Sequence, residues 1–261
     1  MSAGEVTVRP AVGADLPWVA DLVRASFDDA LLPYLVAAQA GIVDWWRTVL
    51  DHPGSFPTTR FLVALGDDGQ RLGYAELKAV DDTTGFLSYV AVEPAARGRG
   101  VAAALVAHHL RSEPHLDAME LDVFETNEPA RRLYDRLGFE ETSRATWWGA
   151  PLAPGAARDD VPVADLHAVL ARHRAYGFTD AVVDPGGAAT RFGVLGDEVL
   201  RCFTPESFDD SDGHAVVRHL FPRLSRRFAV LPAGVDLPDA TPLVQSLRLR
   251  SHRVVDLRED A

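Results

Sequence analysis

Cysteine and lysine are almost absent from this sequence of 261 residues, which has one of each, Cys202 and Lys78. A single cysteine excludes an internal disulfide and is typical of the reducing cytoplasm, where we expect the protein to be located. Cys202 lies in the apolar segment 199–203, so we expect a packed thiol without a chemical role. No cluster of histidines and cysteines has the spacing of metal ligands, and the sequence therefore predicts no metal site.

Long hydrophobic runs and positive charge are also scarce. No apolar run reaches the roughly 18 residues that a membrane-spanning helix needs, and residues 1–10 lack the pattern of a secretory signal. The 26 basic and 38 acidic residues give a net charge of −12, which repels nucleic acid and favours cationic partners. We therefore expect neither a membrane nor a nucleic acid among the partners.

A glycine-rich turn is the most informative feature that is present. It follows the apolar segment 86–92, which predicts a strand, and precedes the alanine-rich segment 101–110, which predicts a helix. Such a turn exposes backbone N–H groups at the positive end of the helix dipole, where phosphate oxygens bind. Its arginines add donors suited to a diphosphate, and its glycines permit a positive φ. We expect a diphosphate-bearing cofactor at Arg97, Gly98, Arg99, Gly100, Val101 and Ala102.

Two other phosphate-binding turns compete with this interpretation. A P-loop requires Gly-Lys followed by Ser or Thr at the helix start, whereas this chain has Gly100-Val101-Ala102 there. A dinucleotide-binding turn requires an acidic residue about twenty positions further on, and Asp122 meets that spacing. The spacing alone leaves the dinucleotide alternative open, and it is the next segment that counts against it.

That segment predicts a strand over 119–124 and then a short helix. Pro129 suits the first turn of this helix, Asn127 suits its N-cap, and Gly138 suits its C-terminal end. The residues that fall on one helical face are Ala130, Leu133, Tyr134 and Leu137.

The turn and this helix together resemble the paired motifs of the GNAT superfamily of N-acetyltransferases. Both motifs occur in the family's order, and the stretch from about Val6 to Trp148 covers the family's domain in full. The resemblance implies a mixed α/β (α+β) fold, in which helices flank a mixed, twisted sheet whose central strands part around the cofactor. It also implies acetyl-CoA (coenzyme A) as that cofactor, with the turn anchoring its diphosphate.

The resemblance implies further roles along the cofactor. Backbone groups of Val90, Ala91 and Val92 would pair with the pantetheine arm of coenzyme A. Tyr134 matches the position whose phenol often lies near the cofactor sulfur as general acid, although a tyrosine on an apolar face can also be a core residue. Asn127 matches a position that contacts the cofactor arm, and a plain N-cap is its alternative role.

The general base that deprotonates the amine is the least constrained residue. Glu76, in the strand before the cofactor strand, is our candidate because its carboxylate could reach the cleft directly or through water. It alternates with Tyr74 and Lys78, so it can equally face solvent. Glu125 and Asp122, further along the chain, are the rival candidates.

By the same resemblance, the region from Phe27 to Pro57 should line the acceptor side. Its acidic and aromatic residues together suit a cationic, partly apolar amine through charge pairing and cation–π contact. These residues are Phe27, Asp28, Asp29, Tyr34, Trp45 and Trp46. The alternative is that the tryptophan pair belongs to the core of a helix.

The composition divides the chain after residue 150. Residues 1–150 form the expected acetyltransferase domain, 151–162 a proline-rich linker, and 163–261 a smaller α+β domain. Three segments of the second part echo the first part in the same order, namely 164–166 with 14–16 at a helix start, 190–192 with 59–61 at a strand start, and 240–249 with the helix 130–139. We expect a degenerate duplication, because the glycine-rich turn is not repeated; an unrelated extension is the alternative.

Together these inferences predict an acetyl-CoA-dependent N-acetyltransferase. We expect transfer of an acetyl group to the amine of a small, cationic molecule by direct attack in a ternary complex. Two alternatives stay open: acetylation of a protein N-terminus or lysine, and a non-catalytic module that binds acyl-CoA. We expect a monomer or a homodimer.

Overall fold

The computed structural model describes residues 6–153, 155, 157–185 and 187–259. Residues 154 and 156 of the expected linker lie outside the described residues. The chain divides into two compact units. Unit 1 is composed of Met1–Ser26, Trp46–Ser143 and Ser246–Ala261, and unit 2 of Phe27–Trp45 and Arg144–Gln245.

The sheet of unit 1 has the strand order β1-β2-β3-β4-β5-β11. Neighbouring strands are antiparallel except β4 and β5, which run parallel. The strands are β1 (Thr7–Pro10), β2 (Arg60–Leu65), β3 (Arg71–Ala79), β4 (Thr84–Val92), β5 (Ala118–Phe124) and β11 (Thr241–Ser251), of which the part from Ser246 belongs to this unit. A hairpin joins β2 to β3, and Gly69 in its turn has a φ of +78°.

Helices pack on this sheet and supply part of its core. They are η1 (Gly13–Asp15), α1 (Leu16–Arg24), the second half of α2 (Ile42–Asp51), η4 (Pro94–Ala96), α3 (Val101–Ser112), α4 (Glu128–Arg136) and α8 (Val254–Glu259). The alanine-rich start of α3 lets this helix pack closely on β2, β3 and β4, where Leu105 and Leu110 are completely buried. Tyr134 and Phe139 extend the same core from α4.

The two parallel strands of unit 1 part as the resemblance predicts. Pairing between β4 and β5 runs from Thr84–Ala118 to Leu87–Leu121, whereas β4 continues to Val92 and β5 to Phe124. Just beyond Leu87, the register between β3 and β4 shifts so that Ser88 has no partner on β3. Such a bulge increases the local bend and twist of a strand. It therefore explains why β4 leaves β5 at this point.

The sheet of unit 2 has the strand order β6-β10-β9-β8-β7. The strands are β6 (Glu140–Pro151), which belongs to this unit from Arg144, β7 (Phe178–Val183), β8 (Thr190–Leu195), β9 (Val199–Cys202) and β10 (Arg226–Pro232). The helical segments are η2 (Leu32–Tyr34), η3 (Val36–Ala38), the first half of α2, α5 (Leu166–Tyr176), α6 (Pro205–Asp209) and α7 (Ser211–Leu220). Phe192, Leu200 and Phe208 lie at the centre of its core.

The two units repeat one order of strand directions. In unit 2, β7, β8 and β9 are antiparallel, β9 and β10 are parallel, and β10 and β6 are antiparallel. In unit 1, β2, β3 and β4 are antiparallel, β4 and β5 are parallel, and β5 and β11 are antiparallel.

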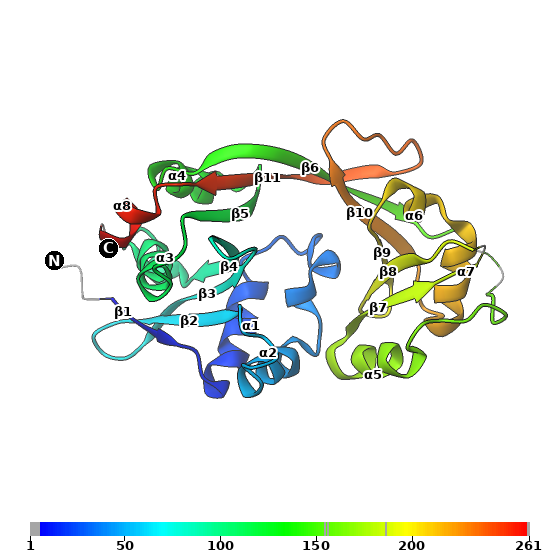
Figure 1. Ribbon diagram of the computed structural model, residues 1–261, viewed down its shortest axis with the longest axis horizontal. Helices are drawn as coiled ribbons and strands as arrows, with labels where there is room; N and C mark the ends of the chain where they lie inside the picture. Colours follow the sequence, from blue (N-terminus) through cyan, green and yellow to red (C-terminus); the bar gives the residue numbers. More distant parts are fainter. Residues whose placement is uncertain (1–5, 154, 156, 186, 260–261) are drawn as a thin grey trace. The chain divides into compact units, whose positions relative to one another are not determined.

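In each unit, the last strand of this order comes from a distant part of the sequence. Strand β11 follows unit 2 in the sequence and pairs with β5 of unit 1 (Figure 1, red beside green), with Ser246 opposite Phe124 and Ser251 opposite Met119. Strand β6 follows unit 1 in the sequence and pairs with β10 of unit 2. Each unit is therefore completed by one strand that is adjacent in sequence to the other unit.

This exchange of strands changes three expectations from the sequence. Residues 240–249, expected to correspond to the helix 130–139, form β11 because Leu247, Leu249 and Ser251 alternate as buried residues of a strand. The strand that starts at Thr190 is β8, which by its pairing takes the place of β3, not of β2. Residues 27–45 and 144–150 belong to unit 2, and the segment from Ser246 belongs to unit 1, so a single cut after residue 150 does not divide the two units.

Candidate functional site

A cavity of about 500 Å³ in unit 1 lies between the end of β4, the turn before α3, and α4. It brings together most of the cofactor-binding residues predicted from the sequence, namely Val90, Ala91, Val92, Arg97, Gly98, Gly100, Val101, Ala102 and Asn127, and also Tyr134. Arg99 and Glu76 are not part of its lining. The two sequence motifs therefore meet at one cavity.

The parting of the strands gives this cavity an open backbone edge. Residues Val90, Ala91 and Val92 pair with Ala75, Tyr74 and Gly73 on one side. On the other side the ladder with β5 has already ended at Leu87, so these residues have no strand partner there. Unpaired N–H and C=O groups along such an edge bind an extended ligand in the way that another strand would.

The turn before α3 has the backbone geometry that the glycines predict. Gly98 has a φ of +75° and Gly100 a φ of +79°, values that side chains disfavour. A Cβ atom at either position would meet no other atom within 4 Å, so the backbone faces open space. Gly100 is the N-cap of α3, and no side chain caps the helix there. The first N–H groups of α3 are therefore available to an anion.

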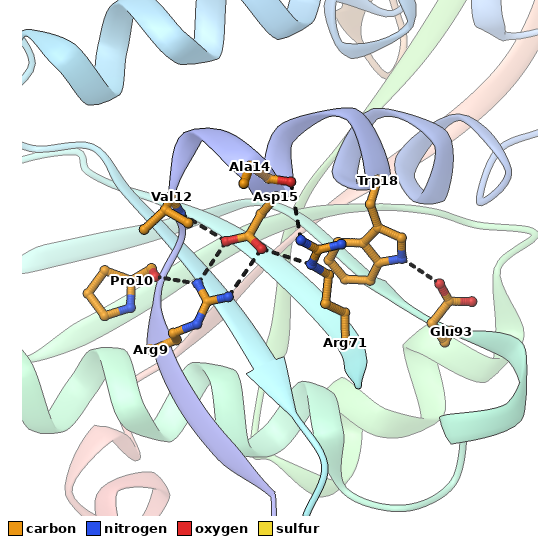
Figure 2. Close-up of polar contacts among 8 residues, drawn as sticks. All are labelled: Arg9, Pro10, Val12, Ala14, Asp15, Trp18, Arg71 and Glu93. Atoms are coloured by element: carbon orange, nitrogen blue, oxygen red, sulfur yellow. Dashed lines mark hydrogen bonds and ion pairs between the residues drawn. The ribbon is translucent and has the colours of Figure 1, made fainter. Parts of the chain in front are cut away.

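A charge network surrounds the buried carboxylate of Asp15 at the start of α1 (Figure 2). The carboxylate of Asp15 is fully buried and lies between two guanidinium groups, at 2.7 Å from Arg9 Nη1 and 2.8 Å from Arg71 Nε. The N–H of Val12 donates a further hydrogen bond to it at 2.9 Å. Burial alone would raise the pKa of Asp15, but these hydrogen bonds outweigh it and lower the pKa to about 2. Asp15 is also the N-cap residue of α1, but its side chain does not cap the helix, because the carboxylate is engaged with the arginines.

Trp18 connects this network to the turn. Its ring lies under the guanidinium of Arg71, 5.7 Å from the ring centroid, and its Nε1–H donates to Glu93 Oε1 at 2.7 Å (Figure 2). Glu93 directly follows β4 and precedes the η4 residues that lead into the glycine turn. The network therefore fixes the point at which the chain leaves β4 for the turn.

Tyr134 is a core residue that also reaches the cavity. Its side chain is 5% exposed and packs edge-on against Phe139 at 5.6 Å between ring centroids, so it belongs to the core. It also lines the cavity. Burial raises the pKa of the Tyr134 hydroxyl, which keeps its proton in place near neutral pH. A protonated phenol at a cavity wall can donate a proton to a leaving group.

Asn127 is the N-cap of α4 and also faces the cavity. Its Oδ1 accepts a hydrogen bond from the N–H of Ala130 at 3.2 Å, which makes it the N-cap of α4. Its side chain lines the cavity as well. Because the cap uses only the carbonyl oxygen, the amide nitrogen stays available to a ligand.

Glu76, the sequence-based candidate for the general base, is buried on β3, one strand away from the cavity edge. It is 4% exposed, and its Oε2 accepts a hydrogen bond from Trp46 Nε1 at 3.2 Å. Lys78 Nζ lies 2.8 Å from its other oxygen. The hydroxyl of Tyr74 beside it is completely buried and has no hydrogen-bond partner among the described residues. Both carboxylate oxygens of Glu76 are thus engaged by protein groups.

The aromatic residues expected on the acceptor side lie in packed cores. Trp46 is 1% exposed and packs in unit 1 against Tyr74 and Phe61, with ring centroids at 5.9 and 6.4 Å. Trp45 packs in unit 2, its ring centroid 5.3 Å from that of Tyr176. Tyr34 lies against Phe228 in the same unit, at 5.0 Å between centroids. Trp46 is therefore a core residue, as the alternative interpretation predicts, whereas Trp45 and Tyr34 are only partly buried.

Several lining residues were not predicted from the sequence, namely Ser26, Ala96, Ala103, Pro129, Ala130, Arg132, Leu133 and Arg136. Most of those on α4 share a signal that could have revealed them, because Pro129, Arg132, Leu133 and Arg136 follow the i, i+3, i+4, i+7 spacing of one helical face. The sequence predicts site roles in this segment only for Asn127 and Tyr134.

Other titratable groups of interest lie outside the cavity. Cys202 is 1% exposed, and burial raises the pKa of its thiol to about 12, as a packed thiol requires. His109 is buried in α3, and burial lowers its pKa to about 4. Within the described part of the chain, no group of three or more His, Cys, Asp or Glu side chains could hold a metal ion. No helix in that part is long and apolar enough to cross a membrane.

Comparison with known proteins agrees with this geometry. The sequence model of the acetyltransferase (GNAT) family matches residues 21–139, which include the open edge of β4, the turn and α4. This part of the chain is a GNAT domain. Two curated relatives are mycothiol acetyltransferases, one from Thermomonospora curvata, 41% identical over 75 residues, and one from Mycolicibacterium gilvum, 37% identical over 96 residues.

The relatives align with only a part of this chain. The alignments cover 28% and 34% of this chain, and the chain spans 25% and 32% of the relatives' own length. The crystal structure of a GCN5-related N-acetyltransferase from Sphaerobacter thermophilus is similar over 94% of this chain and 95% of its own, with a TM-score of 0.57 and 14% identity. That likeness extends beyond the GNAT domain to both units of the fold.

Proposed function

We propose that this protein is an acetyl-CoA-dependent N-acetyltransferase, which transfers an acetyl group to the amine of a small, cationic molecule by direct attack in a ternary complex. The observation that carries the proposal is the meeting, at one cavity, of an open strand edge and an uncapped helix start. These two features fit the pantetheine arm and the diphosphate of coenzyme A. The mycothiol acetyltransferase relatives and the family match support acetyl transfer.

Coenzyme A, when bound, would supply the thioester whose acetyl group is transferred. The backbone N–H groups from Gly98 to Ala102 would bind its diphosphate, and Arg97 would add a charged donor. The open edge at Val90–Val92 would orient the pantetheine arm, with Asn127 contributing its free amide nitrogen. These contacts account for binding and orientation by groups of the chain itself.

Tyr134 and Glu76 would handle the protons. Tyr134 would donate its phenolic proton to the departing thiolate, since burial keeps that hydroxyl protonated. Glu76 would accept the proton of the amine through water, held in position by Trp46 and Lys78. The excess of acidic residues in the chain supports a cationic acceptor.

We also propose that unit 2 is a degenerate repeat of the GNAT fold. The repeated order of strand directions supports this origin. In the segment between β9 and α7 no glycine has a positive φ, so unit 2 would bind no diphosphate there. The protein would then have one active site per chain.

Release of free thiol tests the proposed activity. The full chain is incubated with acetyl-CoA and a panel of small amines, and thiol release should occur with at least one of them. Tyr134→Phe should lower kcat by about 100-fold while the Kd for coenzyme A stays unchanged, as expected for loss of a general acid. Tyr176→Phe, which alters a packed tyrosine of unit 2, is the matched control and should leave kcat unchanged.

A flat trace with every amine would count against the enzyme. If coenzyme A still binds in that case, the non-catalytic module becomes the better description. Activity on a peptide N-terminus or lysine, with none on small amines, would instead favour a protein acetyltransferase.

A further inference from the structure

The cavity carries more positive charge than its turn needs for a diphosphate. Its lining includes Arg97, Arg132 and Arg136 but no aspartate or glutamate. This selection stands out because acidic residues outnumber basic ones by 38 to 26 in the chain. A cavity that excludes carboxylates in an acid-rich protein favours a ligand of high negative charge.

The additional arginines lie on α4, across the cavity from the turn. Arg132 and Arg136 are one helical turn apart and share the lining face of α4 with Pro129 and Leu133. Arg136 is the last residue of the helix. This face therefore extends the basic lining of the cavity from the first turn of α4 to its C-terminal end.

The two arginines differ in what else they contact. Arg132 forms an exposed ion pair with Glu128 at 3.1 Å, which holds its side chain along the helix. Arg136 makes no hydrogen bond or ion pair with any other residue that the structure describes. Its guanidinium thus lines the cavity without a counter-charge from the protein, and an anionic group of a ligand can supply one.

We propose that Arg136, assisted by Arg132, binds the 3′-phosphate of coenzyme A. This inference rests on the proposed function, because it takes coenzyme A as the ligand of the cavity. The diphosphate is provided for by the turn, and the 3′-phosphate is the remaining anionic group of the cofactor. A guanidinium is suited to bind it through paired N–H donors. The α4 arginines then select coenzyme A over 3′-dephospho-CoA, which retains the diphosphate but lacks this phosphate.

A binding experiment distinguishes the proposed contact of Arg136 with the 3′-phosphate from the binding of the diphosphate at the turn. Isothermal titration calorimetry gives the Kd of the full chain for coenzyme A and for 3′-dephospho-CoA. We expect the wild type to bind coenzyme A about 10-fold more tightly, the strength of a charge-assisted contact that is partly exposed to solvent. Arg136→Ala should reduce this preference to about 2-fold by weakening only coenzyme A, and Arg136→Lys should restore part of it, since lysine keeps the charge but loses the paired donors.

Arg131→Ala is the matched control on the same helix. Arg131 is an exposed arginine of α4 that is absent from the cavity lining and donates to the carbonyl of Glu125 at 3.1 Å. This variant should keep the 10-fold preference, because it changes the net charge equally without touching the cavity. Thermal unfolding of each variant verifies that the fold is intact.

The possible results distinguish this inference from the function on which it rests. Equal affinity of the wild type for both ligands would overturn the role of Arg136 and leave the proposed function intact. A preference that survives in the Arg132→Ala, Arg136→Ala double variant would overturn it as well. Binding of neither ligand would overturn the proposed function and this inference together.

Discussion

In each unit, one strand is followed by helical structure and then by a strand that runs parallel to it. The helices between these two strands begin differently in the two units. In unit 1, Gly100 begins α3 without a side-chain cap. In unit 2, Thr204 caps α6 through the N–H of Ser207 at 3.1 Å, and Asp210 caps α7 through the N–H of Gly213 at 2.8 Å. The N–H groups that unit 1 leaves to a ligand are therefore occupied by side chains in unit 2.

This difference teaches that the sheet does not decide which unit binds a phosphate. The order of strand directions is the same in both units. What differs is a few residues at one turn, where a carboxylate such as that of Asp210 both satisfies the helix donors and repels an anion. A fold can thus be retained while its ligand site is lost.

The largest effect concerns the strand that completes unit 1. Leu247 of β11 is 1% exposed in the core of unit 1, and Leu247→Ala should lower the free energy of unfolding by about 3 kcal/mol. Leu243→Ala changes a residue of the same strand that is 37% exposed and belongs to unit 2, and it should cost less than about 1 kcal/mol. Urea unfolding of both variants measures the difference, and equal costs would contradict the exchange of this strand into the core.

A second comparison uses two aspartates that occupy equivalent Ala-Asp-Leu segments. Asp15 is buried between two arginines, whereas Asp165 at the start of α5 is exposed. The pKa of Asp15 is lowered to about 2, below its value in an unfolded chain, so this group stabilises the fold fully above about pH 4. The stabilisation, about 2 kcal/mol, should be lost as the pH falls toward about 2.

Asp15→Asn should therefore destabilise the protein at pH 7. The gap in unfolding free energy between this variant and the wild type should close as the pH approaches 2. Denaturant unfolding between pH 3 and pH 7 follows this gap. Asp165→Asn is the control and should show no comparable gap at any pH. A constant gap for Asp15→Asn would show that this carboxylate does not titrate as its ion pairs require.

A carboxylate at the start of α3, like the one that unit 2 has at the start of α7, should remove the expected difference in phosphate binding between the two units. Gly100→Asp places a carboxylate at the start of α3, where the diphosphate is proposed to bind. We expect affinity for coenzyme A to fall by about 30-fold, or about 2 kcal/mol, through repulsion of the phosphates. Gly100→Asn has almost the same shape without the charge and tolerates a positive φ. It should lose much less affinity in the same titration, and an equal loss in both variants would attribute the effect to shape alone.

The reverse change in unit 2 should have the smallest effect. Asp210→Ala removes the cap of α7 and should cost about 1 kcal/mol of unfolding free energy. Its affinity for coenzyme A should equal that of the wild type, because the proposed site lies in unit 1. A changed affinity would show that the start of α7 takes part in binding.

The local features of the site could be predicted from the sequence because each rests on neighbouring residues. The glycine turn, the cap at Asn127 and the cavity position of Tyr134 follow from short motifs, and the structure contains all three. The parting of β4 and β5 followed from the family resemblance. The bulge at Ser88 that produces it has no evident signal in the sequence.

The exchange of β6 and β11 could not be predicted, because alternation of buried residues shows that a segment is a strand but not which sheet it joins. The comparison of 240–249 with the helix 130–139 went wrong for a related reason. Leu243 and Leu247 are four residues apart, as in a helix, whereas Leu247, Leu249 and Ser251 have the spacing of a strand. Only the partner strand β5, more than a hundred residues away, decides between the two patterns.

A crystal structure with bound coenzyme A tests most directly whether one unit alone binds the cofactor. We predict that the diphosphate accepts hydrogen bonds from backbone N–H groups of the turn between Gly98 and Ala102. We predict no cofactor at the start of α6 or α7, where Thr204 and Asp210 already cap the helices. A diphosphate bound at either of those helices, or a cofactor that leaves the glycine turn without a contact, would contradict this account.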